Sequence, residues 1–397
     1  MVGSESRTNY LSGGMYFTGA YNDNVYPGGS SEPIADFTYS VFPTIAFQMT
    51  RPRQSETFRY SPGFTLYQRN SALNQITQSA QAAFQYRLTA HTTFTLNDAF
   101  SQNSNAFTQP NLAGVAVSGS TQNSVTGIIA PYAETLMNKL QGNVTYQISA
   151  TGMIGGGGSF DILNYPNPQQ VVGLYNFKTS SVSAFYNRRL SSTQYIGGNY
   201  QYARSDTSSP ITTISTGSTS RINGMSLFYS HYFGRTLSFS LSGGAQHVDQ
   251  SFSVAPATAS WMPQGMGSVG WQTERFNLAA SFSRSVSAGN GFYGAFNSTN
   301  ANVSTSWQMS RIWSARLGGA YMLTKSVTPQ VISSRADGHS IFGDFSVERR
   351  IGEHFTAAVG YTRLHQTYGR IPAISVNPDA NREYVSVSYN FTRPLGR

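Results

Sequence analysis

Histidine is the residue type of this chain best suited to acid–base chemistry or metal binding, and the chain has no cysteine. The six histidines form no HxH or HExxH motif, and only Glu353–His354, in a predicted turn, places a carboxylate at a suitable spacing. Without cysteine there is no thiolate ligand, disulfide or cysteine nucleophile. We therefore expect no metal site and no cofactor. The histidines are His91, His231, His247, His339, His354 and His365.

Hydrolysis would need an activated nucleophile or a pair of carboxylates, and the sequence supplies neither clearly. There is no GxSxG motif. His231 has hydroxyl side chains nearby, but the alternation of its strand places it beside Phe233 in an aromatic belt. Asp344 and Glu348 share one strand face, yet four strand residues span about 13 Å, too far for a glycosidase pair acting unaided. We predict that the protein is not an enzyme and that these two carboxylates meet cations.

The composition indicates which elements position these side chains. Of 397 residues, 39 % are hydrophobic, 13 % aromatic and only 11 % charged, against roughly 25 % charged in ordinary soluble domains. No run of about 18 to 20 apolar residues occurs, which excludes a helical membrane protein. The abundance of aromatics argues against disorder. The net charge of +9 is spread along the chain without a basic run, so no nucleic-acid partner is predicted.

Alternation of apolar and polar residues with a period of two recurs along the whole chain, as expected of strands. Between Tyr384 and Phe391 one face is apolar, and the other carries hydroxyl and amide groups. The segment from Phe37 to Met49 shows the same division. A soluble sandwich would need a charged outer face, which this sequence lacks. The apolar face is therefore predicted to meet lipid.

The connections between predicted strands alternate between short turns and long polar stretches. Eight turns and nine long stretches join about 18 strands, or 16 if the two weakest pairs merge. The weakest strands contain Gly155–Gly158 and Tyr195–Tyr202. We predict one all-β domain, residues 1–397: a transmembrane up-and-down antiparallel β-barrel with short periplasmic turns and long extracellular loops. The turns are expected near Arg51–Ser55, Thr89–Thr92, Ser149–Gly152, Ser191–Thr193, Gly234–Thr236, Gln272–Arg275, Ser310–Ile312 and Arg349–His354.

Aromatic residues cluster at the predicted strand ends, where amphipathic rings settle at the membrane interface. One belt near the turns comprises Phe84, Tyr86, Tyr146, Phe233, Phe276, Trp307, Trp313, Phe355 and Phe391. The opposite belt is expected to comprise Tyr21, Tyr67, Tyr321 and Tyr361.

Polar residues on the other strand face are predicted to line a lumen. Charged and amide groups set pore selectivity, and an excess of arginine favours anions or anionic glycans. An equally supported alternative is that the arginines pair with Asp98, Asp344 and Glu348 and brace the wall. Phe42, Tyr67 and Tyr384 also alternate inward without forming an evident path. The predicted lumen residues are Arg59, Arg87, Lys139, Arg316, Asp344, Glu348, Gln85, Gln147 and Gln308.

The stretch 101–131 is unusually long and contains the apolar strings LAGVAV and GIIAPY. Loops of this length are usually functional or disordered. Because an apolar loop outside the cell would expose a patch, we predict that part of it folds into the barrel mouth and narrows the pore.

The segment EYVSVSYNF, with Val385, Val387, Tyr389 and Phe391 alternating, resembles the carboxy-terminal assembly signal of outer-membrane barrels, although TRPLGR follows it here. The whole chain resembles a bacterial outer-membrane β-barrel. The strings RLTAHTTFTLNDAF (87–100) and YNFTRPLGR are loosely similar to barrels that accompany exopolysaccharide export systems. This resemblance implies a mature chain, without its signal peptide, in the outer membrane. Implied partners are outer-membrane lipid, lipopolysaccharide, the barrel-assembly machinery and a periplasmic polysaccharide-export protein.

Two functions follow. A barrel of 18 strands is wide enough for a water-filled channel, so the leading hypothesis is a pore for polar solutes or secreted polysaccharide. The alternative is a barrel plugged by its loops or by a partner, acting as an outer-membrane scaffold or adhesin.

Overall fold

The computed structural model describes most of the chain, and its strands account for nearly all of the regular structure. Within the described segments, no helix has the length and apolar character needed to span a bilayer. The described segments are residues 8–26, 32–103, 134–167, 173–211, 216–253, 255–288, 291–327, 337–369 and 379–394.

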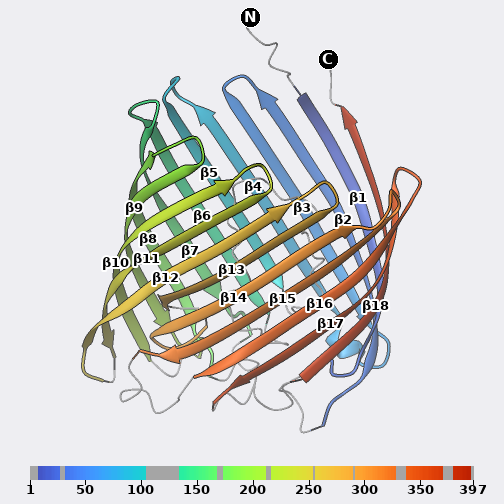
Figure 1. Ribbon diagram of the computed structural model, residues 1–397. Coiled ribbons are helices and arrows are strands. Elements are labelled where there is room, and N and C mark those ends of the chain that lie inside the picture. The colour runs from blue at the N-terminus through green and yellow to red at the C-terminus, as the bar shows by residue number, and fades with distance from the viewer. Residues whose placement is uncertain are drawn as a thin grey trace, which may run out of the picture.

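Eighteen strands form one antiparallel sheet that closes on itself (Figure 1), because β1 pairs with β2, β10 pairs with β9, and β1 also pairs with β18. This confirms the predicted barrel and its strand number. A single 3-10 turn, η1 (Ser71–Leu73), lies between β3 and β4. The strands are β1 (Thr8–Asn22), β2 (Asp36–Arg51), β3 (Gln54–Tyr67), β4 (Gln75–Arg87), β5 (Thr92–Asn103), β6 (Thr135–Gln147), β7 (Gly152–Asn164), β8 (Asn176–Arg189), β9 (Gln194–Ser208), β10 (Gly217–Phe233), β11 (Leu237–Phe252), β12 (Thr258–Gln272), β13 (Phe276–Ala288), β14 (Ala295–Gln308), β15 (Trp313–Ser326), β16 (Gly338–Ile351), β17 (Phe355–Tyr368) and β18 (Asp379–Pro394).

The two rims of the barrel differ as predicted. All eight expected short turns are present, and they lie at the same end as both termini (Figure 1). The strand ends that the nine longer connections join lie at the other end, which we call the long-loop rim. The two strands with the weakest sequence pattern, β7 with Gly155–Gly158 and β9 with Tyr195–Tyr202, are both formed. The turns and the alternation were therefore sufficient to predict the topology.

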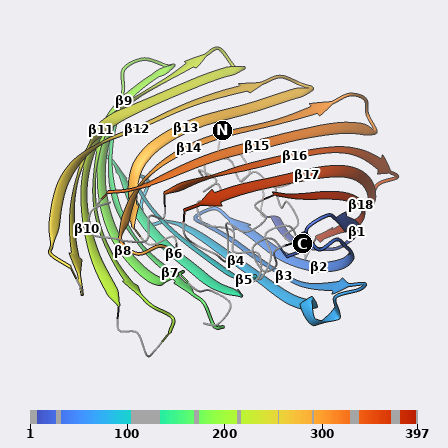
Figure 2. The same ribbon diagram turned by 90° about the horizontal axis from the view of Figure 1, so that it is seen from below.

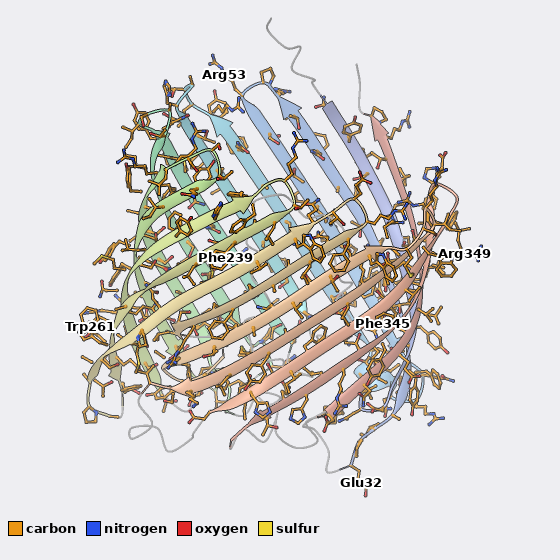
Figure 3. The ribbon with its side chains drawn as sticks, in the orientation of Figure 1. Glu32, Arg53, Phe239, Trp261, Phe345 and Arg349 are labelled. Atoms are coloured by element: carbon orange, nitrogen blue, oxygen red, sulfur yellow. The ribbon has the colours of Figure 1, made fainter. Side chains whose placement is uncertain are left out.

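The two faces of the wall follow the alternation. Large apolar side chains point outward, and Figure 3 shows Trp261, which is 70 % exposed, projecting from the outer surface. Hydroxyl side chains such as Thr38 and Ser40 point inward and are buried. Tyr67 does not belong to the predicted outer belt, because it faces inward and is 4 % exposed. Its neighbour Leu66 takes the outward position instead.

The wall departs from a regular cylinder between β12 and β13. Their pairing ends at Gly265 and Arg284, although β12 begins at Thr258. Pro263, which has no N–H to donate to a ladder, lies two residues beyond the last pair. Beyond this point, residues 285–288 of β13 and 295–296 of β14 turn into the barrel, and Figure 2 shows these strand ends inside the arc of β10 to β12. We call residues 285–288 and 291–296 the inward hairpin.

The inward hairpin is held against the inner face of the wall. Val286 and Ala295 pack against Ile222 of β10 and Val248 of β11, all nearly inaccessible to solvent. Buried backbone N–H groups must find acceptors, and two inward-facing glutamines supply them. The Val286 N–H donates to Gln246 Oε1 at 2.7 Å, and the Ala295 N–H donates to Gln250 Oε1 at 3.2 Å.

Candidate functional site in the barrel lumen

The structure places the predicted lumen residues on the inward face. Arg59, for example, lies between Ala46 and Gln81, whose strands flank β3. Gln147 and Gln308 end their strands at the short-turn rim, where the Gln308 amide donates to the backbone oxygen of Ser310 at 2.6 Å. Their roles in selectivity stay a prediction. The inward positions are occupied by Arg59, Lys139, Arg316, Asp344, Glu348 and Gln85, and at the rim by Arg87, Gln147 and Gln308.

Arg316 is the one predicted lumen arginine that pairs with a carboxylate in the described residues. Its Nη1 lies 2.9 Å from Glu348 Oε1. The Asp344 carboxylate lies on the same inner face and occupies the space beside Gly318, where a Cβ atom would collide with it. Arg316 and Glu348 therefore form an ion pair of the kind that the wall-bracing alternative predicts.

The positive charges of the other lumen cations are balanced less closely by carboxylates. Lys139 lies directly opposite Asp161 of β7, close enough to interact electrostatically. Arg59 has no ion-pair partner among the described residues. The inward positions carry more cations than carboxylates: Arg59, Arg87, Lys139, Arg189, Arg316, Arg350 and Arg382 against Asp36, Asp161, Asp344 and Glu348. The lumen is thus net positive before the undescribed segments are counted.

The wall-bracing alternative placed Asp98 among the carboxylates that meet lumen arginines, and that placement is wrong. It follows Leu96 by two residues and therefore shares its outward face, opposite Leu140 of β6. Its Oδ1 accepts a hydrogen bond of 3.0 Å from Asn138 Nδ2. Asp98 thus lies on the apolar outer face of the wall. The lumen therefore has one carboxylate fewer than that alternative requires.

Replacing Asp98 with leucine should stabilise the barrel. Acidic groups on the lipid face of barrels are unfavourable near the bilayer centre, so we expect Asp98→Leu to raise the free energy of unfolding by about 1–2 kcal/mol. Urea unfolding in lipid vesicles, followed by tryptophan fluorescence, measures this. The matched control is Asn97→Leu at the adjacent inward position, where no gain is expected. A loss of stability in Asp98→Leu would show that the bond to Asn138 outweighs the cost of the carboxylate.

Arg382 of β18 was missed as a lumen residue because the alternation was recognised only from Tyr384 onward. It faces inward two residues before Tyr384 and is 8 % exposed. Its Cζ lies 5.6 Å from the centre of the Tyr384 ring, and Tyr16 and Tyr67 are near enough to interact with its charge. The inward alternation of Tyr384 was the available sequence signal.

The barrel mouth is narrowed by the inward hairpin. Phe292 is 3 % exposed, and its ring lies 5.3 Å from that of Tyr368 of β17. The Tyr293 hydroxyl donates to the backbone oxygen of Gly217 at 3.0 Å, and its ring lies 5.1 Å from Tyr175. The tip therefore spans from β17 to β10 across the long-loop rim. The narrowing predicted for the stretch 101–131 lies outside the described residues, except for 101–103, which end β5.

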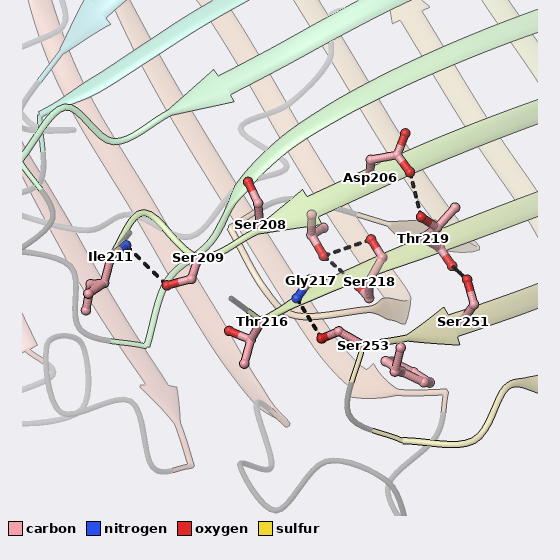
Figure 4. Close-up of a pocket in the computed structure, with 12 residues that line it drawn as sticks. Asp206, Ser208, Ser209, Ile211, Thr216, Gly217, Ser218, Thr219, Ser251 and Ser253 are labelled. Carbon is pink, nitrogen blue, oxygen red and sulfur yellow. Dashed lines mark hydrogen bonds between the residues drawn. The ribbon is translucent and has the colours of Figure 1, made fainter. Parts of the chain in front are cut away.

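A separate hollow of about 560 Å³ lies at the long-loop ends of β9, β10 and β11 (Figure 4). Its lining is rich in hydroxyl groups, and most of these bond to one another, to a carboxylate or to the backbone. Thr219 donates to Asp206 at 2.6 Å, and the Thr207 and Ser218 hydroxyls lie 2.6 Å apart. We assign no ligand to this hollow, because most of its polar groups are already engaged.

The remaining residues that the sequence analysis singled out lie on the outer face of the wall, some of them on β18 where it pairs with β1. His231 faces outward, where its ring stacks 3.9 Å from Phe233. Within the described segments, no three acidic or histidine side chains gather as a metal site would require. The assembly-signal residues also face outward on β18, opposite β1: Val385, Val387, Tyr389 and Phe391.

No protein-family model and no curated protein sequence matches the chain. Among solved structures, OpdK of Pseudomonas aeruginosa with vanillate is 9 % identical, with a TM-score of 0.45 over 96 % of this chain and 99 % of that one. OccAB4 of Acinetobacter baumannii is 8 % identical, with a TM-score of 0.47 over 98 % and 99 %. The FrpB iron transporter of Neisseria meningitidis is 9 % identical, with a TM-score of 0.48 over 96 % and 82 %. The closed sheet itself, with its unequal rims, has the architecture of a bacterial outer-membrane β-barrel.

Proposed function

We propose that the chain forms a water-filled pore in the bacterial outer membrane that passes small polar solutes and favours anions. The carrying observation is the division of the wall, with an apolar outer face and an inner face of hydroxyl, amide and cationic groups. Polar groups would not be directed into a lumen that had to be packed dry. The excess of inward cations supports the preference for anions, since lumen charges set selectivity.

Reconstitution in planar bilayers tests the pore. We expect stepwise conductance, and a reversal potential under a KCl gradient that indicates preference for chloride. Arg59→Gln should weaken that preference by about twofold, because Arg59 carries an uncompensated charge on the inner face. Arg363→Gln removes the same charge from the outer face and should leave the preference unchanged. Preference for potassium in the unmodified protein would contradict the proposal that the pore favours anions.

The inward hairpin favours a second candidate, a plugged barrel acting as an outer-membrane scaffold or adhesin. Zero conductance over many insertions would support it. Passage of a secreted polysaccharide is a narrower version of the pore and has only the loose sequence resemblance behind it. Lipopolysaccharide around the wall, recognition of β18 by the assembly machinery and a periplasmic export partner likewise remain proposals. Growing current block by neutral oligosaccharides of increasing length would support the polysaccharide version.

A further inference from the structure

We propose that three cations on the outer face of the wall bind the phosphate groups of a lipid in the outer leaflet of the membrane. Their side chains are exposed, and the residues beside them on each strand point inward, so the alternation directs the cations outward. This inference goes beyond the proposed pore, because the lipid stays outside the lumen. The three cations are Lys178 of β8, Arg204 of β9 and Arg221 of β10.

The register of the strands brings the three cations together. Arg204 lies directly opposite Arg221. Lys178 lies directly opposite Asp206, which follows Arg204 by two residues on the same outer face. Neighbouring strands are about 4.8 Å apart, so β8, β9 and β10 together span about 10 Å. Like charges directly opposite one another destabilise a sheet, and a bound anion would remove this repulsion.

Asp206 is the carboxylate closest in register to Lys178 and Arg204, and it is already engaged. Its Oδ2 lies 3.2 Å from Arg204 Nε, and its Oδ1 accepts a hydrogen bond of 2.6 Å from Thr219, as Figure 4 shows. Lys178 forms no ion pair within the described segments. Asp206 therefore balances the charge of Arg204 and leaves that of Lys178 unbalanced.

The second carboxylate on this part of the outer face is Asp249 of β11. It lies directly opposite Arg221, but its Oδ2 pairs with His247 Nδ1 at 3.4 Å. Arg221 itself has no ion-pair partner in the part of the chain that the structure describes. Three cations thus face two carboxylates, and protonation of His247 would add a further positive charge. The described part of this patch is net positive.

The depth of the cations along the wall matches the headgroup region of the outer leaflet. All three lie near the strand ends at the long-loop rim. On the membrane side of them the outer face is apolar and well exposed, with Tyr200, Met225 and Leu227. Trp261, which projects from the outer surface in Figure 3, is of the type that settles at the membrane interface. A lipid whose acyl chains lie on this apolar face would place its phosphates beside the cations.

Phosphate suits these donors, because guanidinium groups bind phosphate oxygens with paired, charge-assisted hydrogen bonds and lysine adds a point charge. The two unbalanced cations, Lys178 and Arg221, stand on either side of Arg204. A headgroup with two phosphate groups can meet both of them at once. We therefore expect a lipid with two phosphates to bind more tightly than a lipid with one.

Lipid A that carries two phosphates is the probe for this site, added to the full-length protein in micelles of an uncharged detergent. A ligand that binds the folded state stabilises it, so this lipid should raise the urea concentration at half-unfolding, followed by tryptophan fluorescence. Monophosphorylated lipid A with the same acyl chains is the matched control and should give a smaller shift. Equal shifts with the two lipids would overturn the assignment to phosphate groups.

Variants assign the binding to the three cations, with bound lipid A counted by native mass spectrometry. Arg221→Gln and Lys178→Gln should each weaken binding about fivefold, the upper range for an exposed ion pair, and the double variant about twentyfold. Arg363→Gln removes an outer-face cation that already pairs with Asp379 at 3.1 Å, so it should bind as the unmodified protein does. Heat-modifiable mobility in gel electrophoresis verifies folding. Unchanged binding in the double variant, or in both single variants if the double does not fold, overturns the proposal.

Inorganic phosphate distinguishes a lipid site from a site for soluble anions. An excess of it should leave lipid A bound, because the acyl chains on the apolar wall contribute to the affinity of the lipid. Complete displacement by phosphate would overturn the assignment to a lipid. The pore can fail separately: a protein that conducts without binding lipid A refutes only this inference, and one that binds lipid A without conducting refutes only the pore.

Discussion

Replacing Phe292 and Tyr293 together with alanine should at least double the single-channel conductance, as a rough magnitude for releasing a constriction. Both rings fix the tip of the inward hairpin, Phe292 against Tyr368 and Tyr293 against Tyr175 and the backbone of Gly217. Truncating a buried phenylalanine costs about 3–5 kcal/mol, and a shift of about 5.5 kcal/mol is enough to reverse a two-state equilibrium. The hairpin should then leave the mouth for much of the time.

The control for this experiment is an aromatic residue that does not touch the hairpin. Phe64 is 47 % exposed on the outer face of β3, so Phe64→Ala should leave the conductance unchanged. Larger current noise in the double variant is expected as well, because a released hairpin moves in and out of the mouth. Unchanged conductance in the double variant would mean that solutes pass elsewhere and that the hairpin is not the constriction.

The barrel could be predicted from the sequence because the alternation within each strand predicts which residues face outward and inward. The length of each connection predicts the rim of the barrel at which it lies. Both are local properties. The early end of the pairing between β12 and β13 depends instead on contacts between distant segments. No local sequence pattern therefore predicts it. One trace was nevertheless present: Ile222 and Val248 are apolar residues at inward positions, among serine and glutamine neighbours. An apolar patch on a lumen face indicates that something folds onto it.

The lumen site could be predicted in part for the same reason. Alternation was sufficient to place Arg59 and Lys139 on the inner face, but pairing depends on the register between strands joined by long loops. Arg316 meets Glu348 across β15 and β16, whose register no turn sequence fixes. Asp98 shows the converse: the alternation already placed it outward, and the expectation of an inward carboxylate came from its charge alone. The charge of a residue is therefore a weaker predictor of the face it occupies than the alternation of its strand.

Gly244→Ala should destabilise the barrel strongly, whereas Gly243→Ala one residue away should be nearly neutral. A Cβ atom at Gly244 would collide with the backbone oxygen of Met225 and lie 2.7 Å from Ser226 Cα, so two backbones approach too closely there for any side chain. At Gly243 nothing lies within 4 Å. Overpacking typically costs about 1–3 kcal/mol, and backbone cannot yield as a side chain does, so we expect about 3 kcal/mol for Gly244→Ala. Gly243→Ala should stay within about 0.5 kcal/mol.

The effect of Gly244→Ala should also reach the pore, because β11 holds the inward hairpin. Gln246 and Val248 follow Gly244 on the same inner face, and they bond to and pack against Val286 of the hairpin. A displaced β11 would weaken this support. In the fraction that folds, identified by heat-modifiable mobility, conductance should therefore rise toward that of the Phe292 and Tyr293 double variant. If the folded fraction of Gly244→Ala conducts as the unmodified protein does, the hairpin keeps its place without the support of β11, and the tip contacts alone close the mouth.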